Sequence, residues 1–277
     1  MTEDQDHGRG QDQGRLEAAR SFGGVAVEYG RGRPGYPEEL FDAVERLSGR
    51  SLKNARVLDV GAGTGIATRL LAARGADVVA VEPSAGMAAQ FLASSPGLPL
   101  VRAGGDELPF HDGSADLVTY AQAFHWTRPE LAVPEAVRVL RPGGALAAWW
   151  NIPDETVPWV RARVERMTAA LGDRYHGYGG VAGHVAHFAS AGLRVERAVL
   201  RWERRVTVDE VLADLTSRSF MASLGPAERA PLLEAERVAM TAEFPDGRLV
   251  ERYALELAVA ITPDTPAHPG LTRPTPA

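Results

Sequence analysis

Two short apolar runs, separated by a glycine-rich loop and a helix-like segment, stand out in the pattern of hydrophobic and polar positions. The runs cover residues 57–60 and 77–81. Between them lie the loop, at residues 61–65, and the helix-like segment, at residues 66–73. Parallel strands that are covered on both faces read as nearly continuous Val, Ile and Leu runs, and they need a crossover connection, usually a helix. The pattern therefore predicts a βαβ unit at the start of a doubly wound sheet.

Further strands and helices are expected on both sides of this unit. The strands are expected at residues 98–102, 115–121 and 145–150, and the helices at residues 37–47, 84–94 and 134–140. Residues 153–240 read as mainly helical, with one strand at 193–202, and period-two alternation predicts a last strand at 249–260. The whole pattern predicts an α/β fold with a doubly wound, mostly parallel sheet.

We expect three parts along the chain. Residues 1–20 are polar and lack aromatic side chains, which is typical of a disordered lead-in. Residues 21–261 are expected to form one domain, in which residues 153–243 provide a mostly helical cap and additions on the substrate side. Residues 262–277 contain five prolines and no core pattern, so we expect a tail there.

Composition limits the compartment and the partners. A chain of 277 residues that is 45% hydrophobic can bury one substantial core. It contains no cysteine, which excludes disulfides, thiolate metal sites and a thiol nucleophile, and we expect no metal site. There is neither a secretory apolar segment nor an apolar run of about 18 residues, so we expect a cytoplasmic protein that does not bind a membrane. The formal net charge of −6 repels a phosphate backbone, so we expect no nucleic-acid partner.

The loop and the end of the second strand carry the first candidate ligand contacts. Gly61, Gly63 and Gly65 allow a tight turn and let a ligand approach main-chain N–H groups, and the helix that follows adds a positive dipole end. Glu82 comes about 20 residues later at the tip of the second strand, where carboxylates bind ribose hydroxyls in nucleotide folds. A dinucleotide fingerprint would read G-x-G-x-x-G, but Ile66 occupies its last position, which disfavours NAD.

A second candidate site follows the strand at 115–121. Open α/β sheets bind ligands beyond the carboxyl ends of their strands, so residues 122–126 are expected to face the same crevice as the glycine loop. We assign His125 and Trp126 to the substrate pocket. His125 either removes a proton as a general base, since imidazole titrates near neutrality, or only shapes the pocket.

The stretch VLDVGAGTG, with VEPSAGM after it, closely resembles the class I methyltransferases that use S-adenosyl-L-methionine. The resemblance implies that Asp59 and the glycine loop border the methionine portion of this cofactor. It also implies that Glu82 holds the ribose and that Pro83 and Met87 pack on the adenine.

Two further stretches match the same family. Before x-L-P-F the family usually has a small residue and an acid at the adenine edge, and Gly105 and Asp106 match that pair. The segment A-Q-A-F-H-W resembles a subgroup that includes trans-aconitate methyltransferase-like proteins. We assign Gln122, which belongs to this segment, to the cofactor site.

A last resemblance concerns the N-terminal region. The run Y-x-x-x-R-P-G-Y-P is similar to the lid of small-molecule methyltransferases, in which an aromatic side chain closes over the cofactor. We assign Tyr29 to the cofactor site and Tyr36 to the substrate site, while packing of both tyrosines as loop anchors explains the run equally well. The family topology further implies a seven-stranded sheet in which the last two strands are an antiparallel addition, with helices at about 207–243 covering the cleft.

These residues support two functional hypotheses. The first is transfer of a methyl group from S-adenosyl-L-methionine to an O, N or C atom of a small molecule. The second is a non-catalytic module that binds the same cofactor and regulates a partner. A dehydrogenase is disfavoured by the glycine spacing and by the absence of a catalytic pair near the fourth strand.

Overall fold

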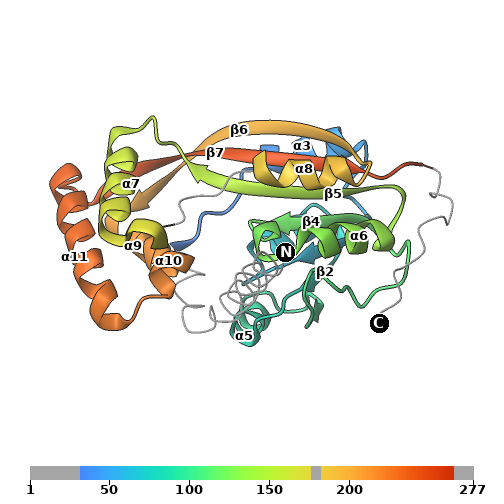
Figure 1. The fold of residues 1–277 in the computed structure, drawn as a ribbon, viewed down its shortest axis with the longest axis horizontal. Coiled ribbons are helices and arrows are strands. Elements are labelled where there is room, and N and C mark those ends of the chain that lie inside the picture. The colour runs from blue at the N-terminus through green and yellow to red at the C-terminus, as the bar shows by residue number, and fades with distance from the viewer. Residues whose placement is uncertain (1–31, 176–181, 265–277) are drawn as a thin grey trace, which may run out of the picture.

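The fold is built on one seven-stranded sheet (Figure 1). The computed structural model describes residues 32–175 and 182–264. The strands are β1 Arg56–Val60, β2 Asp77–Val81, β3 Leu100–Val101, β4 Ala115–Ala121, β5 Leu140–Pro153, β6 Arg194–Thr207 and β7 Arg248–Ile261. Their order is β3-β2-β1-β4-β5-β7-β6, and only β7 runs antiparallel to its neighbours. The predicted doubly wound, mostly parallel, seven-stranded sheet is confirmed.

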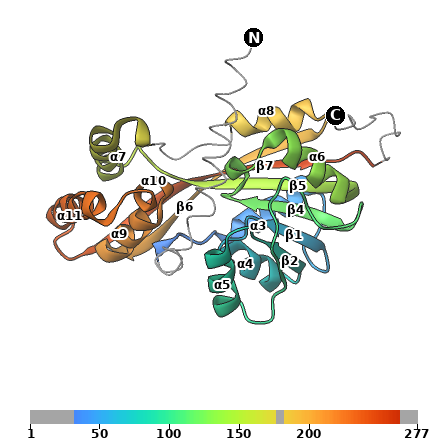
Figure 2. The same cartoon turned by 60° about the horizontal axis from the view of Figure 1, so that its bottom comes forward.

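Helices cover both faces of this sheet. Figure 2 shows α6 and α8 over one face and α3, α4 and α5 under the other. Their bounds are α3 Glu38–Ser48, α4 Ile66–Ala73, α5 Ala85–Ser94, α6 Pro129–Val139 and α8 Ala182–Ser190. Two separate buried clusters result, one per face, and alternate residues of a strand enter different clusters. Trp149 and Trp150 follow this rule, because both are buried but they lie on opposite faces.

A helical lobe lies beyond the carboxyl end of β5, on the left in Figure 1. It consists of α7 Pro158–Leu171, α9 Val208–Ser217, α10 Ser219–Ala222 and α11 Pro226–Glu243, with a short 3₁₀ turn at Gly172–Arg174. Because β5 ends where this lobe begins, the lobe stands at the carboxyl edge of the parallel strands. This is the helical region that the sequence pattern predicts. No helix in the described ranges has the length and apolar character needed to cross a membrane.

Several element bounds differ from those expected. The helix expected at 134–140 begins at Pro129, because proline at the first helical position is the start signal and Pro134 lies inside the helix. The strand expected at 145–150 runs from Leu140 to Pro153, because Leu140 pairs with Ala115 of β4 and the strand pairs with β7 as far as Pro153. The strand expected at 98–102 is only two residues long. Residues 1–20, and the tail after residue 264, lie outside the described residues.

Two buried aspartates meet opposite electrostatic environments. Asp59 on β1 accepts hydrogen bonds from the hydroxyls of Thr68 and Thr119, at 2.6 and 2.9 Å. Burial raises the pKa of Asp59 to about 6, and the two hydroxyl bonds only partly oppose this rise. Asp214 on α9 is also buried, which by itself raises its pKa, but the nearby guanidinium groups of Arg218 and Arg33 outweigh burial and the net shift is downward.

The wild type is expected to lose stability as the pH rises, because its buried Asp59 must ionise. We expect Asp59→Asn to remove this loss. A raised carboxyl pKa stabilises the fold below the pKa of the unfolded chain, and this contribution disappears as the pH rises through about 6. A shift of this size corresponds to about 3 kcal/mol. Denaturant unfolding of both proteins between pH 4 and pH 7 should show the variant gaining up to this amount relative to the wild type. Parallel stability curves would contradict the assignment.

For Asp214 we expect the opposite pH dependence of stability. Its lowered pKa stabilises the fold at neutral pH, and that contribution is lost as the pH falls below the unfolded carboxyl value. Asp214→Asn leaves two buried guanidinium groups without this counter-charge, so unfolding at pH 7 should cost about 3–5 kcal/mol less. Asp209→Asn on the same helix is the matched control, because that carboxylate pairs with Arg237 at the surface. Equal unfolding free energies for the two variants would refute the account.

Candidate functional site

The predicted site residues gather at the carboxyl edge of the parallel strands. The register pairs Val60 of β1 with Val81 of β2, and Asp59 with Thr119 of β4, so the segments that leave these strands start side by side. The glycine loop also touches the segment after β4. A Cβ added to Gly61 would lie 2.5 Å from the Cβ of Ala123. The structure therefore brings the first and second candidate sites together.

The loop at residues 61–65 has a backbone that favours glycine at three positions. Gly61, Gly63 and Gly65 have φ values of 70, 58 and 84°. At Gly65 a Cβ would stand 2.7 Å from the ring of Phe91 on α5, so protein packing also demands glycine there. The N–H groups of Gly61 and Ala62 both donate to the carbonyl of Val81. The loop is thus fastened to the end of β2.

Glu82 fixes the middle of the same loop. Its Oε2 accepts the N–H of Gly63 at 2.8 Å, and its Oε1 accepts the N–H of Ser84 at 2.7 Å. The residue is only 5% exposed, and burial raises its pKa while the two backbone bonds lower it. Each carboxylate oxygen has a second acceptor position, so ligand hydroxyls can still bind there. Asp59 lies beneath the loop with its carboxylate on the two threonine hydroxyls.

The residues assigned to the adenine side lie around the ends of β2 and β3. Met87 in the first turn of α5 is buried and Pro83 is half-buried. A Cβ on Gly105 would come within 3.0 Å of Thr127 and 3.1 Å of Val60, so this position accepts only a small residue. Asp106 accepts hydrogen bonds from the backbone N–H and the Nε of Arg128, both at 2.9 Å. Its carboxylate therefore ties the loop that follows β3 to the start of α6.

The segment after β4 is held in an unusual conformation. Gln122 has a φ of 53°, which is uncommon for a residue other than glycine and concentrates at functional sites. Its N–H donates to the carbonyl of Trp149 at 2.9 Å. The chain then forms the 3₁₀ turn Phe124–Trp126, in which the rings of His125 and Trp126 lie 4.7 Å apart. Both residues are half-buried.

Of the two tyrosines assigned to the predicted N-terminal lid, the structure describes only Tyr36. Tyr36 packs edge-on against Trp149, with the ring centroids 5.7 Å apart, and joins a buried cluster. This is the loop-anchor arrangement that packing predicts, and the substrate contact of Tyr36 stays a prediction. Tyr29 lies outside the described residues.

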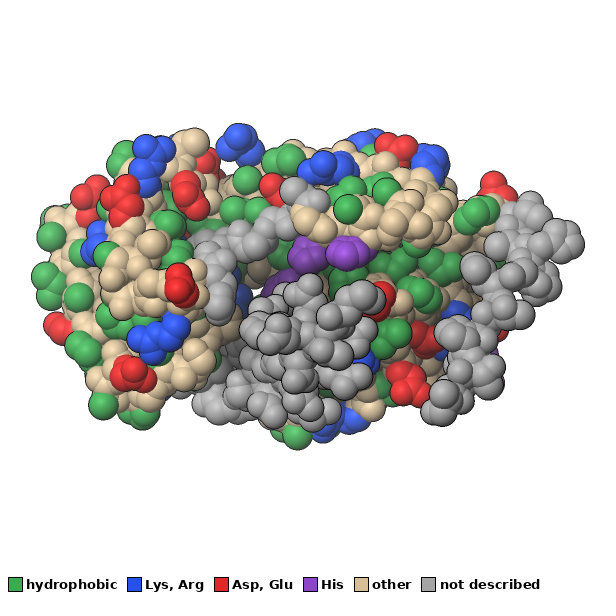
Figure 3. Space-filling view, in the orientation of Figure 1, with side chains coloured by type: hydrophobic (Ala, Val, Ile, Leu, Met, Phe, Trp, Pro, Cys, Tyr) green, Lys and Arg blue, Asp and Glu red, His purple; other side chains and the backbone are tan. Residues whose placement is uncertain are grey.

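Three side chains near the site are not among the predicted site residues. Trp150 donates its indole Nε1–H to Nδ1 of His125, at 3.1 Å. His184 on α8 stacks on Trp150, with the centroids 5.3 Å apart and the planes at 7°. Thr119 is the third, as a partner of Asp59. Strand alternation could have placed Trp150 on the face of α6 and α8, but nothing in the local pattern connects it with His125. Figure 3 shows histidine side chains gathered near the middle of the face drawn.

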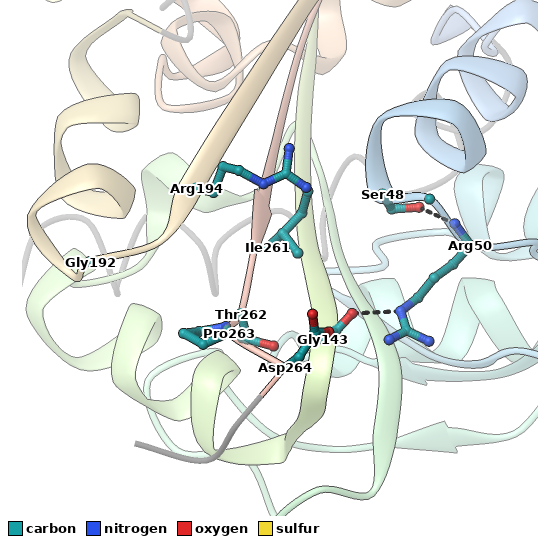
Figure 4. A pocket seen from close by; sticks show the side chains of 10 residues that line it. Ser48, Arg50, Gly143, Gly192, Arg194, Ile261, Thr262, Pro263 and Asp264 are labelled. Carbon is teal, nitrogen blue, oxygen red and sulfur yellow. Dashed lines mark hydrogen bonds between the residues drawn. The ribbon is translucent and has the colours of Figure 1, made fainter. Parts of the chain in front are cut away.

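A cavity of about 440 Å³ lies elsewhere, between the start of β5, the start of β6 and the end of β7 (Figure 4). Arg50, Arg194 and Asp264 are among its lining residues, and Arg50 donates to the carbonyl of Gly143 at 2.6 Å. These segments mark the amino edge of the parallel strands, whereas ligands of open α/β sheets bind at the carboxyl edge. In residues 32–175 and 182–264, no group of three or more His, Asp or Glu side chains could hold a metal ion.

The chain is similar to methyltransferases both in sequence and in structure. Residues 58–148 match the family model described as a methyltransferase domain. An uncharacterized methyltransferase of Mycobacterium tuberculosis is 45% identical over 53% of this chain, and the chain spans 58% of that relative's length. A methyltransferase-like protein of Schizosaccharomyces pombe is 30% identical over 78% of this chain and 84% of its own length.

Solved structures agree with this assignment. A protein of Anaeromyxobacter dehalogenans that is assigned as a type II methyltransferase is 25% identical, with a TM-score of 0.62 over 85% of this chain and 99% of its own. The [4+2]-cyclase SpnF shares the fold at 19% identity, with a TM-score of 0.51 over 84% of each chain. The sheet order, the glycine loop and the relative matched over 84% of its length together show that the chain belongs to the class I methyltransferase family, with its Rossmann-like fold.

Proposed function

We propose that this protein binds S-adenosyl-L-methionine at the carboxyl edge of its sheet and transfers the methyl group to a small molecule. The observation that carries the proposal is the junction between Glu82 and the glycine loop. It places a carboxylate next to backbone N–H groups, at the starts of α4 and α5. A nucleoside with a charged amino-acid tail needs both kinds of partner, a hydroxyl acceptor and a polar loop.

The residues at this junction fit such a ligand. Glu82 retains acceptor positions for ribose hydroxyls, as described above. The hydroxyl of Thr64 in the loop is buried and has no hydrogen-bond partner among the described residues. Buried polar groups are normally satisfied, so an unpartnered hydroxyl beside a glycine loop supports binding of a polar ligand there. The family relatives support the same cofactor.

The protein's contribution to methyl transfer is mainly alignment. S-adenosyl-L-methionine supplies an activated methyl group on its sulfonium, so no residue has to activate the donor. What the chain must do is hold the acceptor atom in line with the methyl group and exclude water. The segment Gln122–Trp126 is suited to this task, because it contacts the glycine loop through Ala123 and is hydrogen-bonded to β5 through the N–H of Gln122.

We place the acceptor beside His125 and Trp126. Both follow the carboxyl end of β4, while the residues assigned to ribose and adenine follow β2 and β3. The aromatic surroundings of His125 favour a small organic acceptor over a polymer, and the net charge of −6 argues against nucleic acid. The A-Q-A-F-H-W segment supports a relation to trans-aconitate methyltransferase-like proteins.

Replacing Glu82 should weaken binding of S-adenosyl-L-methionine while the protein stays folded. Glu82→Gln keeps the shape but removes the charge-assisted contact, which should cost about 1.5–3 kcal/mol, or about 10- to 150-fold in Kd. Asp77→Asn is the matched control, because Asp77 is an exposed acid at the opposite end of the same strand. Calorimetry should show the loss for Glu82→Gln alone and weaker binding of NAD by the wild type. Unchanged affinity in a folded Glu82→Gln variant would remove the basis of the proposal.

Methyl transfer itself is tested by measuring S-adenosylhomocysteine. The purified protein is incubated with S-adenosyl-L-methionine and panels of small metabolites, and a proposed acceptor must raise product formation well above the background without acceptor. We expect at least one small-molecule class to do so. Tight cofactor binding without turnover on any panel would favour the regulatory module instead.

A further inference from the structure

His125 accepts a hydrogen bond from the indole of Trp150. It lies in the turn after β4, and Trp150 lies in the neighbouring strand β5, where Tyr120 and Ala148 are paired. The indole Nε1 of Trp150 is 3.1 Å from Nδ1 of His125, and Trp150 is only 3% exposed. The donor side of this bond is buried, so removing the acceptor would leave the indole N–H without its partner in a largely dry place.

The identity of the donor decides the state of the imidazole. An indole nitrogen can only donate a hydrogen bond, so Nδ1 of His125 must be the acceptor. In a neutral imidazole the other nitrogen then carries the proton. We propose that Trp150 fixes His125 as the neutral Nε2–H tautomer, so that His125 serves the methyl acceptor as a hydrogen-bond donor rather than as a general base.

The surroundings of Trp150 keep the indole in place. His184 stacks on one face of the indole, and it also meets Phe124 edge-on at 5.5 Å. Phe124 packs against Phe188 at 4.9 Å and is fully buried. Because the indole cannot turn without disturbing this cluster, its N–H is preorganised toward His125.

This arrangement opposes base catalysis at both ring nitrogens. Nε2 already carries a proton and cannot accept one. Protonation at Nδ1 would set its new N–H against the indole N–H, so the hydrogen bond would be lost. The two nitrogens point to nearly opposite sides of the ring, so Nε2–H is directed away from Trp150. An acceptor molecule that uses it must present a lone pair, such as a carbonyl or carboxylate oxygen.

Other titratable groups lie near His125 and Trp150 and can also contribute to the pH dependence of activity. His184 on α8 stacks on Trp150, and Glu256 on β7 lies directly opposite Trp150 in the strand register. Beyond the turn, Asp106 is bound to Arg128. On β4, Tyr120 contacts Phe124, and burial raises its pKa far above the neutral range.

The tautomer follows from the hydrogen bond alone, whereas the donor role toward an acceptor rests on the proposed methyl transfer. The first measurement therefore needs no activity. Long-range ¹H–¹⁵N correlation spectra of ¹⁵N-histidine-labelled protein at pH 7.5 should show His125 with a protonated Nε2 and an unprotonated Nδ1, assigned by loss of the signals in His125→Gln. The Nδ1–H tautomer or an imidazolium at this pH in the wild type would overturn the proposal.

A pair of tryptophan variants tests whether Trp150 sets the tautomer of His125. Trp150→Phe removes the indole N–H, so His125 should shift toward a mixture of tautomers. Trp159→Phe makes the same chemical change in the helical lobe, where Trp159 packs against Phe244, and should leave His125 unchanged. Unaltered His125 signals in a folded Trp150→Phe variant would contradict the role of Trp150. The wild-type spectrum decides the tautomer even if Trp150→Phe fails to fold.

Kinetics with an identified acceptor then test the donor role. His125→Gln retains an N–H donor and should keep kcat/KM within about tenfold of the wild type, and Trp150→Phe should gain a pH-dependent limb near neutrality. A 10²–10⁴-fold loss in His125→Gln, with a wild-type limb near pH 6.5 that disappears in this variant, would identify a general base and refute the proposal. The expected tautomer without methyl transfer to any acceptor would refute the donor role and the proposed function, while leaving the Trp150 bond established.

Discussion

The carboxylate of Glu82 joins the two strands on which the site is built. Beyond Val60 and Val81 the ladder between β1 and β2 ends, and the N–H groups of Gly61 and Ala62 still bind the Val81 carbonyl there. Glu82 extends this connection by accepting the N–H of Gly63, while its other oxygen accepts the N–H of Ser84 in its own segment. Since α4 and α5 both begin at this point, their dipoles favour the negative charge. One side chain therefore shapes the loop and supplies its acceptor.

The βαβ unit could be predicted almost to the residue. The helix at 66–73 and the strands at 77–81 and 115–121 have the expected bounds, because each follows from a local apolar run with clear end signals. Glu82 was also assigned from its place at the tip of β2, and it does meet the glycine loop. Local pattern and tertiary structure agree here because a covered parallel strand leaves little choice of sequence.

The rest depends on contacts between segments far apart in the chain. The full length of β5 could not be predicted, because its carboxyl end is extended by pairing with β7, about 100 residues later. The partners of Asp59 come from β4 and α4, and only the register of β1 with β4 brings Thr119 beside it. Likewise, the bond from Trp150 to His125 depends on how two neighbouring strands end. Such cross-strand pairs leave no periodic signal in the sequence.

The central claim is that the carboxyl edge of the sheet, at the glycine loop and Glu82, holds the methyl donor. A crystal structure of the protein with S-adenosylhomocysteine tests this most directly. The account predicts density for the ligand against residues 61–65, with the ribose hydroxyls on the Glu82 carboxylate and the sulfur facing the segment after β4. The account would be contradicted if the ligand density lay in the cavity at the amino edge, beside Arg50 and Arg194, and not at the glycine loop.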